Sequence, residues 1–328
     1  MQNILITGGA GYIGSACLRW MLNKGYNVYA FDNLSEGNKA AIPDAESRLI
    51  IGNILDFDLL VSTLKEKKID AVMHFAAAVS VPESINDPEF YWRTNVSGTK
   101  TVLDAMVATN VKKLVFSSTA ATYSFESPMP LQFDSAQAPT VPYGVTKLAC
   151  ESIIKDYAKT YEIGCSIMRY FNAAGADPSG QFGESRKKES HLIPLVLLTA
   201  LGKRDTIYVF GTDWETPDQT CIRDFVHVDD ISNAHELSLN HIKPHKVDAY
   251  NIGLGKGVSV REIITISESI IGKKINSIDK PRRAGDPGIL YTNPQKLKDE
   301  LGWAPKYNSI EEIIKSAWNW HKSHPNGY

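Results

Sequence analysis

The sequence lacks three features that would each indicate a particular class of protein. No apolar run reaches about 18 residues, the length that a membrane-spanning helix needs, so we expect no membrane partner. The 35 basic residues are balanced by 37 acidic ones, and no basic run could follow a phosphate backbone, so nucleic acid is not expected either. Only four cysteines occur, with no CxxC pair and no matched histidine spacing, which predicts buried thiols and neither disulfides nor a metal site.

A secretion signal is also missing from the first residues. The chain passes within three residues into a β-rich run, without the basic start and long apolar stretch of a signal peptide. We therefore expect the protein to remain in the cytoplasm. Its 328 residues, 43% of them apolar, are enough to bury one large core or two moderate ones.

Short β-branched runs alternate with segments of helical periodicity through the first half of the chain. The runs are NILIT, NVYAFD, RLIIGN, AVMHFA, KLVFSS and CSIMRYF. They are apolar nearly throughout, as strands are when helices cover both faces of their sheet. This alternation predicts an α/β fold with a doubly wound parallel sheet of the Rossmann type.

The pattern changes after about residue 171. The stretch GADPSGQFGESRKKES is rich in glycine, serine and charge, and shorter, less regular elements follow it. We therefore predict a Rossmann domain over residues 1–172 and a smaller mixed α/β lobe over residues 173–328. Some segments of that lobe are expected to return to the first domain.

A glycine turn follows the first apolar run. Gly8, Gly11 and Gly14 come directly after NILIT and open a helical segment, where missing side chains let backbone N–H groups approach a pyrophosphate. Eighteen positions after Gly14, the second run ends in Asp32, whose carboxylate would accept the ribose hydroxyls of NAD and repel the 2′-phosphate of NADP. A purely structural turn and a polar strand end are the alternative interpretations.

One tyrosine stands out among the 14 in the chain. Only Tyr143 has a lysine four residues on, at Lys147, and on a helix that spacing places both side chains on one face. A free phenol has a pKa of about 10, and a nearby ammonium favours the phenolate. We therefore predict Tyr143 as a base that Lys147 activates.

Upstream, KLVFSS leads into Ser117, Ser118 and Thr119 at the end of a strand, where Thr119 could share a proton with Tyr143. A surface pair and a strand-ending polar run are the structural alternatives.

These features, with others along nearly the whole chain, resemble the extended short-chain dehydrogenase/reductase family, and within it the nucleotide-sugar 4-epimerases. The matching segments are TGGAGYIGS, FDNLS, VMHFAA, NVSGT, FSSTAATY, PYGVTK, RYFNAAGADPSG, HLIP, QTCIRDFVHVDD, PRRAGDP and AWNWHKSHPNGY.

The resemblance implies a role for residues in three groups. It makes Thr119, Tyr143 and Lys147 the catalytic residues. The two phosphates of a UDP-sugar are well matched by guanidinium groups, and the second lobe contains Arg223 and Arg283. The implied NAD-binding residues are Gly8, Gly11, Tyr12, Ile13, Gly14, Asp32, Asn33, Asn53, Ile54, Phe75, Ala76, Ala77, Asn95, Ser117, Tyr143, Lys147 and Tyr170. The implied substrate-binding residues are Thr119, Tyr143, Asn172, His191, Leu192, Arg223, Arg283, Asp286 and Leu290.

The chain departs from the family pattern at several positions. Asn53 stands where an aspartate often meets the adenine, and Val79 replaces a lysine that some members carry near the cofactor phosphates. Leu290 lies where members differ between a large aromatic and a small residue, so a 2-acetamido sugar remains an open substrate. Ala120 and Ala121 occupy the places where a 4,6-dehydratase carries its acid/base pair, so dehydration is not expected.

The implied reaction inverts C4 of the sugar and interconverts UDP-galactose and UDP-glucose. Tyr143 would remove the O4 proton, directly or through Thr119, while hydride passes from C4 to NAD and later returns to the other face of a 4-keto sugar. UDP-N-acetylhexosamines or UDP-pentoses are alternative substrates. An NAD-sensing regulator, the non-enzymatic alternative, would have no need of Tyr143 and Lys147. The resemblance also implies a homodimer that pairs helices within residues 90–110 and 143–160.

Overall fold

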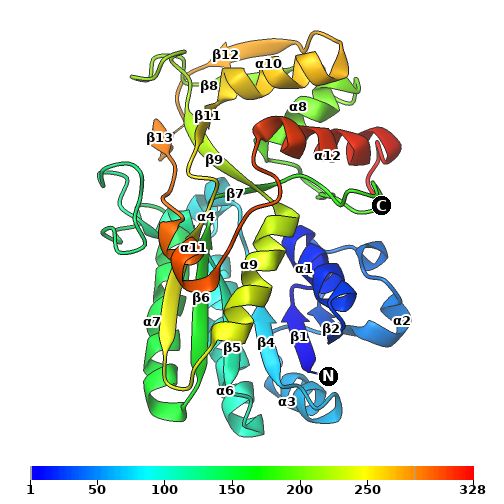
Figure 1. Ribbon diagram of the computed structural model, residues 1–328, viewed down its shortest axis with the longest axis vertical. Coiled ribbons are helices and arrows are strands. Elements are labelled where there is room, and N and C mark those ends of the chain that lie inside the picture. The colour runs from blue at the N-terminus through cyan, green and yellow to red at the C-terminus, as the bar shows by residue number, and fades with distance from the viewer. Residues whose placement is uncertain (1, 284) are drawn as a thin grey trace.

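The computed structural model describes residues 2–283 and 285–328 and is organised around a sheet of seven parallel strands in the order β3–β2–β1–β4–β5–β6–β10 (Figure 1). All six runs predicted from the first half of the chain are strands of this sheet, which confirms the predicted doubly wound fold. The strands are β1 (Asn3–Thr7), β2 (Asn27–Asp32), β3 (Leu49–Ile51), β4 (Ala71–His74), β5 (Lys113–Thr119), β6 (Gly164–Tyr170) and β10 (Val247–Ile252).

Helices cover both faces of the large sheet. Successive side chains of a strand point to opposite faces, so Ile4 and Ile6 join one hydrophobic core and Leu5 joins the other. This two-sided burial is the reason that the strands are apolar nearly throughout. On the first face lie α1 (Tyr12–Asn23), α9 (Val228–His241) and α11 (Gln295–Leu301). On the second face lie α3 (Phe57–Glu66), α6 (Gly98–Thr109) and α7 (Pro142–Tyr161).

A smaller lobe lies beyond the carboxyl ends of the large sheet (Figure 1). Its strand β9 pairs with β7, β11 and β13, and a separate pair joins β8 to β12. The strands are β7 (Asn172–Ala174), β8 (Ile207–Phe210), β9 (Ile222–His227), β11 (Gly257–Ser259), β12 (Ser277–Lys280) and β13 (Ile289–Leu290). The helices α8 (Leu192–Ala200), α10 (Val260–Ile271) and α12 (Ile310–Ser323) bury a third core against them.

The second half of the chain also completes the large sheet. β10 pairs in parallel with β6, and α9 packs against α1. The first half of β10 is only partly buried at the sheet edge, so its sequence VDAYNI carries polar residues and gives a weak strand signal. Short helical segments connect the remaining elements: η1 (Lys39–Ala41), α2 (Ala45–Arg48), α4 (Val81–Asn86), α5 (Pro88–Tyr91), η2 (Trp92–Ser97) and η3 (Ala120–Thr122).

The prediction about the cysteines is confirmed. All four cysteines are buried and unpaired, as predicted: Cys17, Cys150, Cys165 and Cys221. Within the described ranges, every helix is too short or too polar to cross a membrane.

A buried ion pair joins α7 to the sheet. The guanidinium of Arg169 in β6 donates from Nε and Nη2 to the two carboxylate oxygens of Glu151 in α7, at 2.9 and 2.6 Å. Ser118 of β5 donates to the same carboxylate at 2.6 Å, and Gln137 donates to it at 3.1 Å. Although burial raises the pKa of Glu151, the hydrogen bonds and charge of Arg169 outweigh it and lower the pKa. The network therefore holds α7, β5 and β6 in one arrangement.

Removing the charge of Glu151 should destabilise the protein strongly. Glu151→Gln leaves the buried guanidinium of Arg169 without its counter-charge, which costs about 3–5 kcal/mol for a buried pair. Urea unfolding followed by circular dichroism measures the change. The control is Glu46→Gln, which breaks the exposed pair with Lys39 and should leave the unfolding midpoint in place. Equal midpoints for both variants would contradict the role of the buried pair.

Candidate active site

The glycine turn between β1 and α1 is built for close approach of a ligand to the backbone. Gly8 has φ of +70°, and a Cβ there would lie 2.6 Å from the backbone nitrogen of Ala76. A Cβ at Gly14 would collide with the carbonyl oxygen of Gly8, whereas one at Gly11 would meet only that oxygen, at 3.3 Å. Gly11 precedes α1 as its N-cap residue and supplies no side-chain cap, so the N–H groups of the first turn are available to an anion. The turn therefore fits a pyrophosphate.

Asp32, at the end of β2, is tied to this turn. Its Oδ2 accepts a hydrogen bond from the backbone N–H of Ala10 at 2.9 Å, and its Oδ1 accepts one from Leu34 at 2.8 Å. Burial raises the pKa of Asp32, and these two hydrogen bonds oppose the shift. Each carboxylate oxygen keeps acceptor capacity for a ribose hydroxyl. The predicted neighbour Asn33 follows directly and accepts from the N–H of Ser35 at 3.0 Å.

Asn95 organises the segment that follows β4. It lies in the π-helical turn η2, and its side chain accepts from the N–H of Ala78 at 2.8 Å and donates to the Ala78 carbonyl at 3.1 Å. A third bond, at 3.1 Å, reaches Thr146 of α7. Asn95 thus connects the carboxyl end of β4 to α7. The predicted residues Phe75, Ala76 and Ala77 lie in this same segment.

The carboxyl ends of β3, β5 and β6 supply further predicted residues. Asn53 and Ile54 follow β3, where the Asn53 side chain accepts from the N–H of Leu55 at 3.0 Å. Ser117 of β5 and Tyr170 of β6 form a hydrogen bond between their hydroxyls. Most of the predicted cofactor residues thus come from one edge of the sheet, where parallel sheets bind ligands. Tyr12 and Ile13 open α1 at that edge.

Tyr143 and Lys147 occupy the first two turns of α7. The ammonium of Lys147 is buried and donates to the carbonyl oxygen of Ser117 at 2.9 Å. Burial lowers the pKa of Lys147 to about 8. A Cβ at Gly144 would collide with the carbonyl oxygen of Ala121, so glycine at this position lets α7 approach η3 and brings Tyr143 to Thr119.

Burial dominates the environment of Tyr143. It raises the pKa of Tyr143, while Thr119 and the charge of Arg186 act to lower it. The ammonium of Lys147, one turn further along α7, donates to Ser117, so its predicted effect on Tyr143 stays a prediction. The ring of Tyr91 packs edge-on against Tyr143 with ring centroids 6.5 Å apart, a contact that the sequence did not reveal.

Three of the predicted substrate residues share the small sheet around β9. Leu290 of β13 lies directly opposite Arg223 in the paired strands, and Nη1 of Arg223 donates to the carbonyl of Ile222 at 2.9 Å. Asn172 of β7 donates to the carbonyl of Asp224 at 2.8 Å. The structure therefore places Asn172, Arg223 and Leu290 on neighbouring strands of one sheet.

The other predicted substrate residues fall into two groups. His191 and Leu192 begin α8, where Nδ1 of His191 lies 2.6 Å from Oε1 of Glu184. Arg283 and Asp286 lie between β12 and β13, and the guanidinium of Arg283 stacks over Phe210 at 3.8 Å from the ring centroid. Phe210 was not anticipated, because an aromatic residue at a strand end carries no distinctive sequence signal.

The segment before α8 contains a charged cluster that the sequence analysis treated as an irregular stretch. Oε1 of Glu184 accepts from Nε of Arg186 at 2.8 Å as well as from His191. Ligand atoms of Glu184, Glu189 and His191 lie within 4.8 Å of one another. Although burial lowers the pKa of His191, Glu184 raises it more, which favours the protonated ring as the partner of this carboxylate. This arrangement favours an ion network over a metal site.

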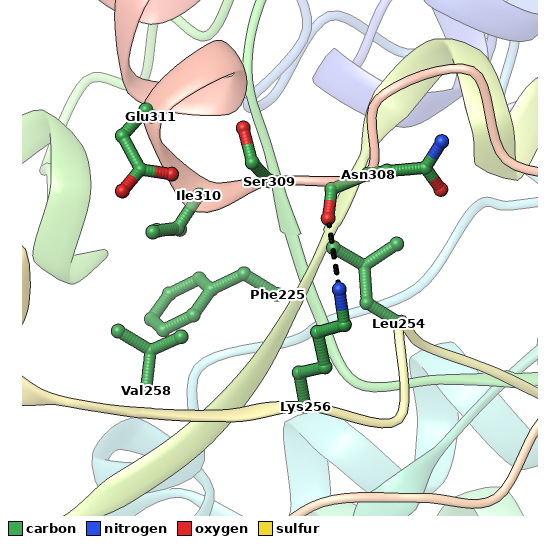
Figure 2. Close-up of a pocket in the computed structure, with 8 residues that line it drawn as sticks. All are labelled: Phe225, Leu254, Lys256, Val258, Asn308, Ser309, Ile310 and Glu311. Carbon is green, nitrogen blue, oxygen red and sulfur yellow. Dashed lines mark hydrogen bonds between the residues drawn. The ribbon is translucent and has the colours of Figure 1, made fainter.

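A separate cavity lies where the start of α12 meets β9 and β11 (Figure 2). Lys256 spans part of it and donates to the carbonyl of Asn308 at 3.4 Å. None of the predicted site residues lines this cavity. Its lining residues are Phe225, Leu254, Lys256, Val258, Asn308, Ser309, Ile310 and Glu311.

Comparisons with known proteins agree with this geometry. The sequence model described as "NAD dependent epimerase/dehydratase family" matches residues 4–253. The UDP-glucose 4-epimerase of Halalkalibacterium halodurans is 46% identical over 326 residues, covering 99% of this chain and 97% of the relative.

The solved structures similar to this chain include further 4-epimerases. The UDP-glucose 4-epimerase of Bifidobacterium longum, in complex with NAD+ and UDP, is 35% identical, with a TM-score of 0.95 and full coverage of both chains (100% each). The UDP-Glc/GlcNAc 4-epimerase of Campylobacter jejuni is 40% identical with a TM-score of 0.84, covering 98% of this chain and 100% of that one. The glycine turn, Asp32 and the Tyr143–Lys147 pair thus occur in a chain that belongs to the NAD-dependent epimerase/dehydratase family.

Proposed function

We propose that this protein is an NAD-dependent UDP-glucose 4-epimerase that interconverts UDP-galactose and UDP-glucose. The observation that carries the proposal is the close approach of α7, which carries Tyr143, to η3 directly after Thr119, at the edge of the sheet whose glycine turn fits a pyrophosphate. The names of the similar proteins support the same activity.

The chemistry needs one proton-transfer group and one hydride carrier. When bound on the glycine turn, NAD would accept the hydride from C4 of the sugar and give it back to the opposite face. Tyr143 would take the O4 proton and later return it, and Thr119, which acts to lower the pKa of Tyr143, could relay that proton.

Tyr143 needs help to act as a base because burial raises its pKa. Thr119 acts to lower that pKa, since a hydroxyl beside the phenolate stabilises the charged form. Lys147 would act at a different point. Its ammonium, held by Ser117, would meet the ribose of the bound cofactor and fix its position.

The residues beside Thr119 limit the reaction to epimerisation. Ala120 and Ala121 form η3 directly after it and carry no acid or base. A dehydratase would need such groups to remove water from the keto sugar. The reaction would therefore return to the alcohol without loss of water.

The substrate's UDP would bind in the small lobe. Arg223 and Arg283 offer guanidinium groups for the two phosphates, and Asn172, His191, Leu192 and Asp286 complete the proposed nucleotide site. If most of the binding energy falls on the UDP, the sugar is free to turn over between the two hydride transfers.

We propose the cytoplasm, where NAD and nucleotide sugars are available, as the site of action. Cell fractionation tests this proposal.

Replacing Tyr143 by phenylalanine should abolish the conversion of UDP-galactose while NAD stays bound. Loss of the general base lowers kcat by about 10²–10⁴-fold. NAD stays bound because the substitution removes only the hydroxyl and keeps the ring. The assay uses purified protein without added NAD and follows UDP-glucose by chromatography. Tyr26→Phe, which removes a surface hydroxyl that bonds Asn240, is the control and should keep full activity. Near-normal turnover by Tyr143→Phe would rule out this base.

Leu290 should limit the size of the sugar. Leu290→Cys shortens the side chain opposite Arg223 and should raise the ratio of UDP-N-acetylgalactosamine to UDP-galactose turnover roughly tenfold. Ile289→Cys is the matched control, because neighbouring residues of a strand point to opposite faces. The same assay on the unsubstituted chain tests the alternative, an enzyme that acts mainly on N-acetylated or pentose sugars. An unchanged ratio in Leu290→Cys would exclude this residue as the limit.

We also propose that the protein is a homodimer that pairs α6 and α7 with their counterparts. Large apolar side chains on and beside these helices are at least 36% exposed, namely Phe90, Trp92, Val145 and Tyr161. Sedimentation should give twice the mass of the chain. Trp92→Glu should shift the mass towards the monomer, whereas Ile278→Glu, an equally exposed site on β12, should not. A monomeric unsubstituted protein would refute the proposal.

A further inference from the structure

The segment between β7 and α8 reaches back to the glycine-turn side of the large sheet. Lys187 donates to the carbonyl oxygens of Leu34 and Ser35, which follow Asp32. Lys188 forms an exposed ion pair with Glu83 of α4 at 3.2 Å. Residues 184–191 therefore lie beside two of the loops that rise from the carboxyl ends of the parallel strands.

Arg186 is held at the centre of this segment by one of its three nitrogen atoms. Its Nε donates to Oε1 of Glu184 at 2.8 Å. Glu184 is itself fixed, because its carboxylate is buried and bonded to His191, and its carbonyl accepts from the indole of Trp320 at 3.0 Å. The Arg186 side chain is only 23% exposed. Across residues 2–283 and 285–328, its Nη1 and Nη2 nevertheless have no hydrogen-bond acceptor. Two donors of an oriented guanidinium are thus available to a ligand.

The charge of Arg186 reaches both ends of the proposed reaction site. It acts to lower the pKa of Tyr12, in the first turn of α1, and of Tyr143, in the first turn of α7, against the larger effect of burial in each case. Tyr12 is itself fixed by its hydroxyl, which donates to the carbonyl of Gly175 at 2.7 Å. By contact, the segment that carries Arg186 joins the loop after β2, through Lys187, to the start of α8, where Glu184 bonds His191.

The carboxylates near Arg186 do not accept hydrogen bonds from its Nη atoms, because they have other partners. Glu184 is already shared by Arg186 and His191, and Glu189 accepts from the backbone N–H groups of Ser190 and His191 at 2.7 and 2.8 Å. Because the Nη atoms form a planar fork, they match the oxygens of a phosphate in a bidentate arrangement. A ligand with adjacent anionic oxygens would satisfy both donors.

We propose that Arg186 binds a pyrophosphate through Nη1 and Nη2, as a phosphate-binding residue additional to Arg223 and Arg283. The inference rests on the proposed function, which brings two pyrophosphates to this site, one in the dinucleotide and one in the nucleotide sugar. Both present the same chemistry to a guanidinium, and the experiment separates them.

The test compares Arg186→Gln, Arg186→Lys and the unsubstituted protein in two binding assays. The first measures the NAD that remains bound after gel filtration, released by acid and quantified by its absorbance. The second measures the dissociation constant of UDP for the NAD-loaded protein by calorimetry. Loss of a charge-assisted pair of hydrogen bonds should weaken one of the two ligands about 10- to 100-fold. Arg186→Lys, which keeps the charge without the fork, should fall between the other two proteins.

Lys188→Gln is the matched control, because it removes one positive charge two residues away at the exposed pair with Glu83. It should bind NAD and UDP like the unsubstituted protein. Weaker NAD binding in Arg186→Gln assigns the residue to the dinucleotide, and weaker UDP binding assigns it to the nucleotide sugar. Unchanged binding of both ligands would overturn the inference, as would equal losses in Lys188→Gln. Absence of UDP-galactose conversion in the unsubstituted protein would refute the proposed function instead, since both binding assays are independent of turnover.

Discussion

The buried pair of Glu151 and Arg169 is the interaction on which the geometry of the proposed site depends. It joins the helix that carries Tyr143 to β6, and through Ser118 to the strand that ends in Thr119. A buried guanidinium and carboxylate are costly unless each hydrogen bond is satisfied, so the pair tolerates little displacement of α7 against the sheet. The proposed base and its hydroxyl neighbour are therefore fixed by an interaction about two helical turns beyond Tyr143 on α7.

Much of the fold could be predicted because a parallel sheet with two covered faces leaves a strong trace in the sequence. Each of the first six strands is a short apolar run, and each is followed by a segment with helical periodicity. β10 was missed, since it lies at the sheet edge and its first residues are only partly buried. The small lobe was predicted only in outline. Its strands of two to six residues pair with partners distant in sequence, β7, β11 and β13 with β9 and β8 with β12, and local patterns do not encode such pairing.

The sequence motifs of the site could be predicted, whereas the contacts of its charged side chains could not. Glycine spacing, Asp32 and the spacing of Tyr143 and Lys147 are local patterns, and the structure brings them to one edge of the sheet. The contacts of Lys147 with Ser117 and of Arg186 with Glu184 were not predictable, since burial and hydrogen bonding decide which partner a charge takes. The effect expected of Lys147 on the pKa of Tyr143 was inferred from spacing alone. Spacing fixes the face of a helix but not the acceptor that a four-carbon side chain reaches.

The pairing of β13 with β9 has a consequence for how such an enzyme could change its substrate. β13 contains only Ile289 and Leu290, and the backbone pairing sets Leu290 opposite Arg223. A point substitution at Leu290 would alter the volume at the proposed sugar site and leave the backbone hydrogen bonds intact. An insertion or deletion of one residue would instead turn the strand over and move Leu290 to its other face. With Leu290 at the proposed sugar site, sugar preference would change by single-residue exchange, whereas a length change in this short strand would break the register of Leu290 with Arg223.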